Sequence, residues 1–252
     1  MPFICGGYPA RETTAAALPA LERAGASIVE VGIPFSDPIA DGPVIAAAMH
    51  EALGMGATPL EVFNQVASVR DRIRIGLVAM CSVSIVQRMG GPDGFARNAK
   101  AAGFDGLIIP DVPLEEAGEI IAAGRASNLT VSLLVAPTTP PDRAAEIARA
   151  STGFVYLLAR TGITGERADA PDVSRLVAQV RRATDLPIAC GFGISRPEHV
   201  AAVVGPGGAD AAIIGSAIVR RMGLAQAEGK DPAAEAQAFV SQLATGLARS
   251  GP

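Results

Sequence analysis

Short runs of Val, Ile and Leu recur along the chain, and Ala-rich stretches with helical spacing lie between them. Turn residues such as Gly, Pro and Asp follow each apolar run. Near-continuous apolar runs that alternate with helical segments are typical of parallel strands covered by helices. Eight such runs occur, at residues 3–7, 27–34, 73–80, 105–113, 130–137, 153–160, 186–193 and 210–218.

Eight βα units in 252 residues are what a closed (β/α)8 barrel needs, although an open doubly wound sheet is the alternative. The helix starts agree, because Pro141, Pro197 and Pro232 stand where the first turn of a helix is predicted. No linker or low-complexity segment interrupts the series, so we expect one domain over residues 1–252. In such a barrel, the reacting residues lie at the C-terminal ends of the strands.

The second apolar run places a carboxylate among strand-forming residues. Alternation along a strand puts Ile28, Glu30 and Gly32 on one face, with Val29 and Val31 on the other face against helices. If the first face looks inward, Glu30 enters the barrel mouth. A buried acid without a partner has a raised pKa, which suits a proton donor near neutral pH; a Glu held by backbone amides or an Arg is the structural alternative.

Charge and composition narrow the class of protein. The net charge is −4 and Arg is scattered among acids, so we expect neither nucleic acid nor a membrane surface as a partner. The start “MPFICGGYPA” has no basic region before an apolar stretch, and no segment reaches the roughly 18 apolar residues of a membrane span. We therefore expect a cytoplasmic protein. The cysteines, Cys5, Cys81 and Cys190, lack CxxC spacing and are expected to be buried thiols.

The rare residue types exclude several reactions. Lys100 and Lys230 do not end strands, which argues against a Schiff-base aldolase. His50 and His199 fall in predicted helices, so we predict no metal site and no His that polarises a carbonyl. Acid–base chemistry at strand ends is then left to carboxylates and a tyrosine: Glu30, Asp37, Asp41, Asp111 and Tyr156. Asp37 and Asp41 also fit ordinary turn chemistry, in “FSDP” and “ADGP”.

Two glycine-rich turns follow the seventh and eighth predicted strands. These are “GFGIS” at residues 191–195 and “GSAIV” at residues 215–219, where a helix is predicted to begin. Glycines let backbone N–H groups approach an anion, and these two loops commonly form a phosphate site in the barrel. The loop “ARTGITGE” at residues 159–166 is either a lid over the substrate or a plain surface loop.

Together these motifs resemble the α subunit of tryptophan synthase. The stretch “VEVGIPFSDPIADGP” is similar to that family's signature, and “PFICGGYP”, “LIIPDVP”, “YLLARTGITG”, “GFGIS” and “IIGSAIV” match it in order over nearly the whole chain. The resemblance implies a (β/α)8 barrel that cleaves indole-3-glycerol phosphate to indole and glyceraldehyde 3-phosphate. It also implies an α-β-β-α assembly with a β subunit that receives the indole. No cofactor is implied in this chain, and pyridoxal phosphate is expected only in the β subunit.

The resemblance further implies roles for single residues. Glu30 and Asp41 would be catalytic, Glu30 in both proton transfers and Asp41 as acceptor of the indole N–H. The other implied roles are substrate contacts for Phe3, Tyr156, Thr164 and Phe192, phosphate contacts for Gly165, Gly193, Gly215 and Ser216, and subunit-interface positions for Asp37 and Gly162.

Three departures from the family pattern are visible. The first strand begins almost at Met1, so the barrel is expected to lack the family's usual N-terminal cap helix. Met80 and Ser82 stand in the third strand where the family typically has Tyr and an Asn-Pro or similar, and Ala46 stands where Gln is common. We expect changed packing of the indole and changed coupling to the β subunit.

These departures keep other functions open. A stand-alone indole-3-glycerol phosphate lyase would have the same acids and phosphate loops, and the altered third strand mildly favours it. A non-catalytic allosteric partner of a β subunit would predict loss of Glu30 or Asp41, yet both are present. A sugar-phosphate isomerase or epimerase would normally need a strand-end His, Lys or metal ligands.

Overall fold

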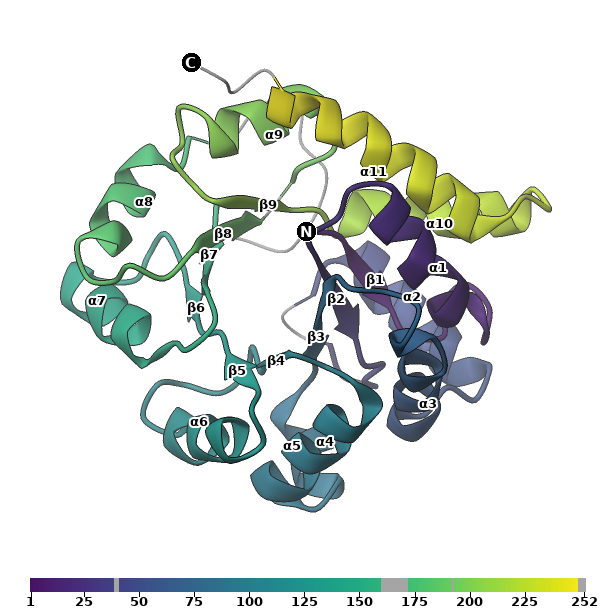
Figure 1. The fold of residues 1–252 in the computed structure, drawn as a ribbon, viewed down its shortest axis with the longest axis horizontal. Helices are drawn as coiled ribbons and strands as arrows, with labels where there is room; N and C mark the ends of the chain where they lie inside the picture. Colours follow the sequence, from purple (N-terminus) through teal and green to yellow (C-terminus); the bar gives the residue numbers. More distant parts are fainter. Residues whose placement is uncertain (39–40, 160–171, 192, 249–252) are drawn as a thin grey trace.

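A computed structural model describes residues 1–38, 41–159, 172–191 and 193–248 of the chain. Parallel strands form the centre and helices surround them (Figure 1). The strands are β1 (Phe3–Cys5), β2 (Ile28–Gly32), β3 (Gly76–Met80), β4 (Gly106–Ile108), β5 (Thr130–Val131), β6 (Leu134–Val135), β7 (Val155–Leu158), β8 (Ile188–Gly191) and β9 (Ala211–Ile213).

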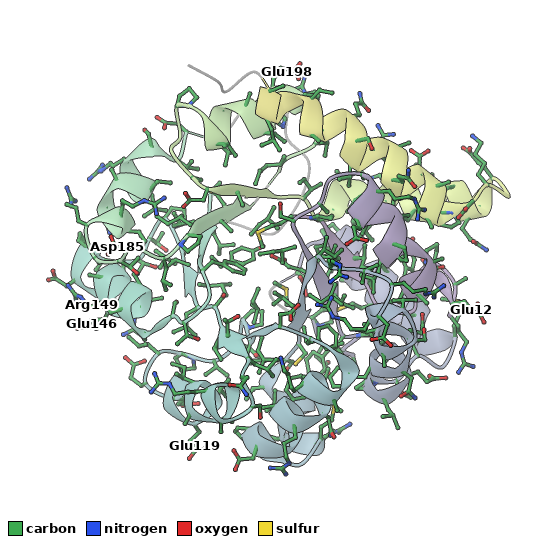
Figure 2. The ribbon with its side chains drawn as sticks, in the orientation of Figure 1. Glu12, Glu119, Glu146, Arg149, Asp185 and Glu198 are labelled. Atoms are coloured by element: carbon green, nitrogen blue, oxygen red, sulfur yellow. The ribbon has the colours of Figure 1, made fainter. Side chains whose placement is uncertain are left out.

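The helices lie on the outside of this sheet. They are α1 (Thr13–Arg23), α2 (Pro43–Gly54), α3 (Pro59–Arg70), α4 (Val83–Arg88), α5 (Gly91–Ala102), α6 (Ala117–Ala126), α7 (Pro141–Ala150), α8 (Ser174–Arg181), α9 (Pro197–Val204), α10 (Ser216–Ala227) and α11 (Pro232–Ala248). None of these helices is long and apolar enough to cross a membrane. Acidic side chains such as Glu12, Glu119 and Glu146 point outward at the rim (Figure 2).

The sheet closes on itself. Strands β1 to β5 form one parallel run and β6 to β9 another. The two runs join because β5 and β6 are parts of one strand, in which Ser132 N donates to Leu107 O at 3.0 Å and Tyr156 N donates to Leu133 O at 3.0 Å. At the other seam, Phe3 N donates to Ile214 O at 2.8 Å. The described strands thus occupy eight positions in a closed barrel, and the predicted (β/α)8 fold is confirmed.

Alternation along the strands separates two apolar layers. Val29 and Val31 of β2 belong to the large core between barrel and helices. Val78, Ile108, Phe154, Ala189 and Ile213 form a second cluster inside the barrel, and Ile28 packs against it. Side chains on a strand point alternately to its two faces. Glu30 and Gly32 therefore share the inner face with Ile28, as predicted.

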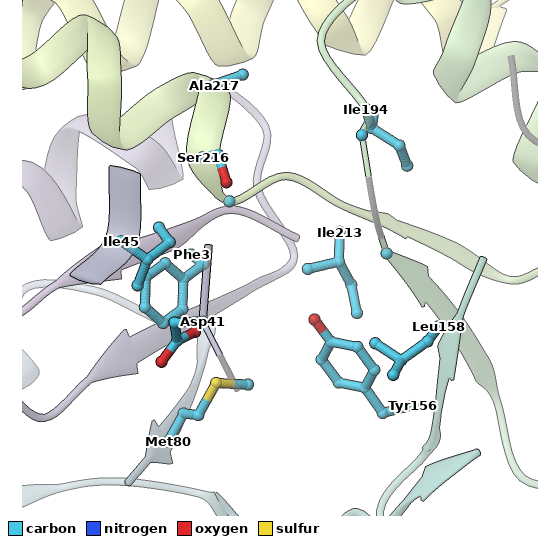
Figure 3. Close-up of a pocket in the computed structure, with 13 residues that line it drawn as sticks. Phe3, Asp41, Ile45, Met80, Tyr156, Leu158, Ile194, Ile213, Ser216 and Ala217 are labelled. Atoms are coloured by element: carbon cyan, nitrogen blue, oxygen red, sulfur yellow. The ribbon is translucent and has the colours of Figure 1, made fainter. Parts of the chain in front are cut away.

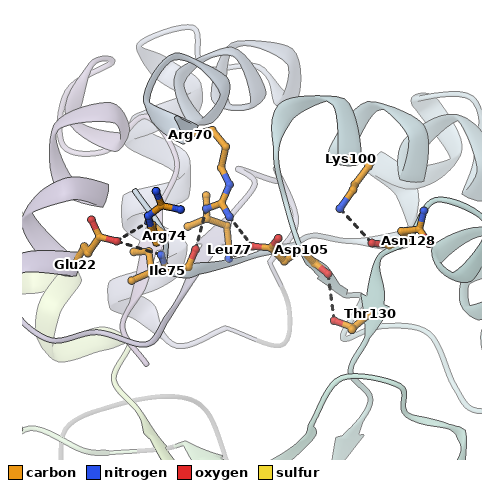
Figure 4. A network of polar contacts seen from close by, with 9 residues as sticks. All are labelled: Glu22, Arg70, Arg74, Ile75, Leu77, Lys100, Asp105, Asn128 and Thr130. Atoms are coloured by element: carbon orange, nitrogen blue, oxygen red, sulfur yellow. Dashed lines mark hydrogen bonds and ion pairs between the residues drawn. The ribbon is translucent and has the colours of Figure 1, made fainter. Parts of the chain in front are cut away.

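Polar clamps fix the N-terminal ends of the strands, opposite to the C-terminal ends that carry the candidate site. Arg70 of α3 donates to Ile75 O at 2.8 Å and to the Asp105 carboxylate at 3.3 Å (Figure 4). The same carboxylate accepts from Leu77 N at 2.9 Å, so it ties the start of β3 to the residue before β4.

A second clamp has the same arrangement at the starts of β8 and β9. Arg181 of α8 donates to Leu186 O and to the Asp210 carboxylate. That carboxylate also accepts from Ile188 N at 2.7 Å.

Candidate active site

Glu30 lies inside the barrel with no exposed surface. In the parallel register it pairs with Phe3 of β1 on one side and Val78 of β3 on the other. Neither carboxyl oxygen has a hydrogen-bond partner among the residues that the structure describes. Burial therefore raises the pKa of Glu30 to about 8, and the nearby Met1 ammonium opposes this shift only in part. At neutral pH the group is mainly a protonated acid.

Glycines make room for the aromatic rings around Glu30. A Cβ at Gly32 would lie 2.4 Å from Cζ of Phe3, so only a glycine lets that ring sit over the end of β2. A Cβ at Gly191 would lie 3.1 Å from the hydroxyl oxygen of Tyr156. Glycines at these two strand ends thus allow the Phe3 and Tyr156 side chains to lie in the barrel mouth.

A pocket of about 580 Å³, its open mouth included, lies at the C-terminal ends of the strands. Phe3, Asp41 and Met80 lie on one side of it in Figure 3, and Tyr156 and Ile213 on the other. The pocket brings together six of the residues singled out in the sequence: Phe3, Asp41, Tyr156, Gly193, Gly215 and Ser216. Its remaining lining is mostly apolar and comes from Ile45, Met80, Leu158, Gly191, Ile194, Ile213 and Ala217.

Asp41 reaches the pocket from the turn between β2 and α2. Its backbone N–H donates to Pro38 O at 3.0 Å. Burial raises the pKa of its carboxyl to about 6. Asp41 is therefore mainly ionised at pH 7 while Glu30 is mainly protonated. Two carboxyls with separated pKa values can act in different roles, one as proton donor and one as hydrogen-bond acceptor.

Tyr156 projects from β7 into the same space (Figure 3). Its pKa is raised well above the usual value, first by burial and then by the charge of Glu30. The phenol thus stays neutral and keeps its O–H proton. It offers one donor and an apolar ring to a ligand.

The opposite end of the pocket is built from backbone. Gly215 precedes α10, and Ser216 is the first residue of that helix with 8% of its surface exposed. Gly193 follows β8 with φ +76°, in the region that glycine enters without strain. A helix start carries unpaired N–H groups and a favourable partial charge for an anion. This end can hold a phosphate.

Other candidates lie away from the pocket or outside the described residues. Asp37 is exposed and accepts from the Ser36 hydroxyl at 2.7 Å. Asp111, a candidate for acid–base work, instead accepts from the Ser82 hydroxyl at 2.6 Å and from Val83 N at 2.9 Å, so it holds the loop after β3. Thr164, Gly165, Gly162 and Phe192 lie outside the described residues.

Metal and thiol chemistry receive no structural support from the described part of the chain. The described residues contain no group of three or more His, Cys, Asp or Glu that could hold a metal ion. Cys5, Cys81 and Cys190 are buried free thiols, as predicted. Burial raises the pKa of Cys190 to about 12, which keeps its sulfur in the unreactive thiol form.

Sequence reasoning missed several pocket residues for an identifiable reason. Ile45, Leu158 and Ile194 are apolar and follow the same patterns as core residues, so nothing in the sequence distinguishes them. Met80 differs from these three, because its departure from the family pattern predicts changed packing of the indole. Its position at the end of β3, in register with Gly32, puts it in the pocket wall.

Comparisons with known proteins agree with this geometry. Residues 1–248 match the family described as tryptophan synthase alpha chain. A tryptophan synthase alpha chain of Rippkaea orientalis is 45% identical, over 88% of this chain and 83% of the relative. One of Chloroflexus aggregans is 42% identical, over 99% of this chain and 92% of the relative.

Solved structures extend the similarity to three dimensions. The tryptophan synthase subunit alpha of Legionella pneumophila superimposes with a TM-score of 0.88 at 31% identity, covering 98% of this chain and 92% of that one. A Mycobacterium tuberculosis tryptophan synthase structure gives a TM-score of 0.86 at 35% identity, covering 97% and 90%. On sequence and structure together, the chain belongs to the tryptophan synthase alpha chain family.

Proposed function

We propose that this chain performs its family's reaction, the retro-aldol cleavage of indole-3-glycerol phosphate to indole and glyceraldehyde 3-phosphate, with Glu30 and Asp41 as catalytic residues. One observation carries the assignment of roles. Glu30 is fully buried, has a pKa of about 8 and has no hydrogen-bond partner among the described residues. It does not line the pocket itself, but Phe3, its partner in register, does so together with Asp41. Such a carboxyl is a proton donor at neutral pH.

The reaction requires two proton transfers. The Glu30 carboxyl protonates the ring carbon that bears the glycerol chain, which makes the indole ring cationic. The resulting Glu30 carboxylate removes the proton from the hydroxyl on the adjacent chain carbon. That carbon becomes the aldehyde, the carbon–carbon bond breaks, and its electron pair returns to the ring to give indole. Glu30 ends protonated, ready for another turnover.

Asp41 stabilises the cationic ring. Its carboxylate, mainly ionised above pH 6, accepts a hydrogen bond from the indole N–H while the positive charge develops. A preformed acceptor in a largely apolar pocket acts more strongly than it would in bulk solvent. Phe3 and Tyr156 flank the ring in this arrangement, and Thr164 and Phe192 complete the substrate contacts.

The phosphate of the substrate binds at the start of α10. Gly215 and Ser216 offer backbone N–H groups there, and Gly193 faces the same end of the pocket. Gly165 is the further phosphate contact that we propose. The reaction moves protons and an electron pair within one substrate, so it requires no oxidant and no cofactor in this chain.

We propose a tryptophan synthase β subunit as the partner, in an α-β-β-α assembly in the cytoplasm. A surface groove beside the loop after β2 supports this assignment. Its lining includes Phe35, Asp37 and Leu60, and Leu60 is 62% exposed. An exposed apolar side chain next to a surface carboxylate fits a protein partner. Asp37 and Gly162 are the proposed interface residues, and the pyridoxal phosphate belongs to the β subunit.

The assignment is tested by measuring indole release from indole-3-glycerol phosphate, with and without a cognate β subunit. Glu30→Gln and Asp41→Asn should each lower kcat by roughly 100-fold or more, the range of a lost acid–base or charge-stabilising group. Glu119→Gln, on the outer surface of α6, is the matched control and should leave kcat unchanged. Full activity of the Glu30 variant would refute the proposal. Fast turnover that the β subunit does not change would indicate a stand-alone lyase.

A further inference from the structure

His199 lies outside the pocket and contacts the loop that forms one of its walls. It is the third residue of α9, and 2% of its surface is exposed. Its Nδ1 accepts the backbone N–H of Ser195 at 3.3 Å. Ser195 directly follows Ile194, which lines the pocket (Figure 3). The imidazole thus joins the wall of the pocket to the helix behind it.

This contact resembles one half of a capping box. In a capping box, a side chain at the third helical position reaches back to a backbone N–H at the helix start. The residue before α9, Arg196, makes no capping hydrogen bond with its side chain. The His199 backbone N–H donates to Arg196 O at 3.0 Å, and its side chain reaches one residue further back. His199 is therefore bonded to both residues that precede the helix.

The backbone from Gly193 to Ser195 requires a restraint if it is to keep one orientation. Gly193 has φ +76°, and glycine has more backbone freedom than any other residue. A glycine in a loop can turn its N–H in several directions unless the residues after it are fixed. Ile194 is 2% exposed and packed, and Ser195 is bonded to His199. These two restraints limit the directions open to the Gly193 backbone.

We propose that His199 is a positioning residue for phosphate binding. Its Nδ1 holds the Ser195 N–H and thereby keeps the backbone of Gly193 directed at the phosphate end of the pocket. The proposal rests on the phosphate site proposed above. It assigns a role in binding to a histidine that the sequence indicated to be an ordinary helix residue.

The hydrogen bond from Ser195 N–H determines which nitrogen of the neutral His199 ring carries the proton. An imidazole nitrogen that accepts a hydrogen bond carries no proton, so the proton of the neutral ring is on Nε2. The Nδ1 position is one bond from Cγ, as is Oδ1 of an asparagine. Asparagine can therefore supply the acceptor at nearly the same place, and leucine has a similar shape without it.

The test compares His199→Leu with His199→Asn. His199→Leu should raise the KM for indole-3-glycerol phosphate and the inhibition constant of glycerol 3-phosphate about fivefold, since a net hydrogen bond contributes about 1 kcal/mol and 1.4 kcal/mol corresponds to tenfold. In this variant kcat should stay unchanged. His199→Asn should restore both constants, and His50→Leu, on an exposed position of α2, serves as the control.

Two results would overturn the inference. One is unchanged constants in His199→Leu. The other is equal impairment of the Leu and Asn variants, because ring packing rather than the acceptor would then matter. If wild type neither cleaves the substrate nor binds glycerol 3-phosphate, the proposed function is also wrong. If wild type cleaves the substrate and binds glycerol 3-phosphate, and His199→Leu has the same KM and inhibition constant, only the proposed role of His199 is wrong.

A measurement on wild type needs no substitution and tests the contact itself if His199→Leu fails to fold. Long-range proton–nitrogen NMR at neutral pH distinguishes the two imidazole tautomers. The spectrum should show His199 with an unprotonated Nδ1 and a protonated Nε2. A ring protonated on Nδ1 cannot accept from Ser195 and would overturn the inference.

Discussion

Replacing Glu30 with Gln should stabilise the folded protein, and should do so more strongly as the pH rises. The carboxyl is fully buried, and its pKa is raised from 4.5 to about 8 because burial disfavours the charged form. In the unfolded chain the same carboxyl ionises near its ordinary value. Between the two pKa values the unfolded state binds fewer protons than the folded state. The free energy of unfolding therefore falls by about 1.4 kcal/mol for each unit of rising pH.

The size of the effect follows from this window. Compared with a pH below both pKa values, the ionisation of Glu30 should lower the free energy of unfolding of wild type by about 3 kcal/mol at pH 7. At pH 5 it should lower it by about 1 kcal/mol. Gln keeps a neutral polar side chain of the same size, so it avoids the loss. The buried Met1 ammonium, with a pKa lowered to about 6, titrates nearby with the opposite effect. For this reason the informative quantity is the difference between variant and wild type at each pH.

Urea unfolding followed by circular dichroism at pH 5, 6, 7 and 8 measures this difference. Glu30→Gln should exceed wild type by about 1 kcal/mol at pH 5 and about 3 kcal/mol at pH 7. Glu119→Gln, at an exposed position, should show no such trend. If the difference between Glu30→Gln and wild type does not vary with pH, Glu30 ionises as readily in the folded protein as in the unfolded chain, and burial does not raise its pKa.

Three further predictions follow from the same geometry. The pH profile of kcat/KM should be bell-shaped with limbs near pH 6 and pH 8, because ionised Asp41 and protonated Glu30 are both required. Asp41→Asn should remove the acidic limb, and a wild-type profile without that limb would contradict the role of Asp41. Gly32→Ala should lower the free energy of unfolding by about 1–3 kcal/mol and raise KM, because the new methyl group collides with the Phe3 ring; urea unfolding and steady-state kinetics check this, and wild-type values for both would show that the ring is not confined. Asp105→Ala should lower the free energy of unfolding by about 1–3 kcal/mol with kcat unchanged, since the start of β3 loses its acceptor; urea unfolding and kcat check this, and an unchanged urea midpoint would contradict the clamp.

The barrel could be predicted because its strands are buried on both faces. Such strands appear as continuous apolar runs, and the period of two then fixes which residues point inward. That is why the inward position of Glu30 followed from its neighbours Val29 and Val31. The division of the fifth strand into β5 and β6 could not be predicted in the same way. It depends on hydrogen bonds with both neighbouring strands, which join residues distant in sequence.

The candidate site was only partly predictable. Glycine turns and acids at strand ends carry local signals, so Asp41, Gly193 and Gly215 could be proposed from the sequence. Asp111 has the same local signal as Asp41, but its carboxylate is bonded to the loop after β3, through Ser82. His199 is the opposite case. Its contact is with a residue four positions earlier, and whether that contact serves the pocket depends on where the loop lies.

The barrel keeps Glu30 protonated at neutral pH, and direct titration of its side chain tests this most closely. Glutamate labelled with ¹³C at the side-chain carboxyl gives a resonance for each residue, and Glu30→Gln identifies the one that belongs to Glu30. This resonance should keep the chemical shift of the protonated form at pH 6 and titrate with a midpoint near pH 8. A midpoint near the ordinary glutamate value of 4.5 would contradict it.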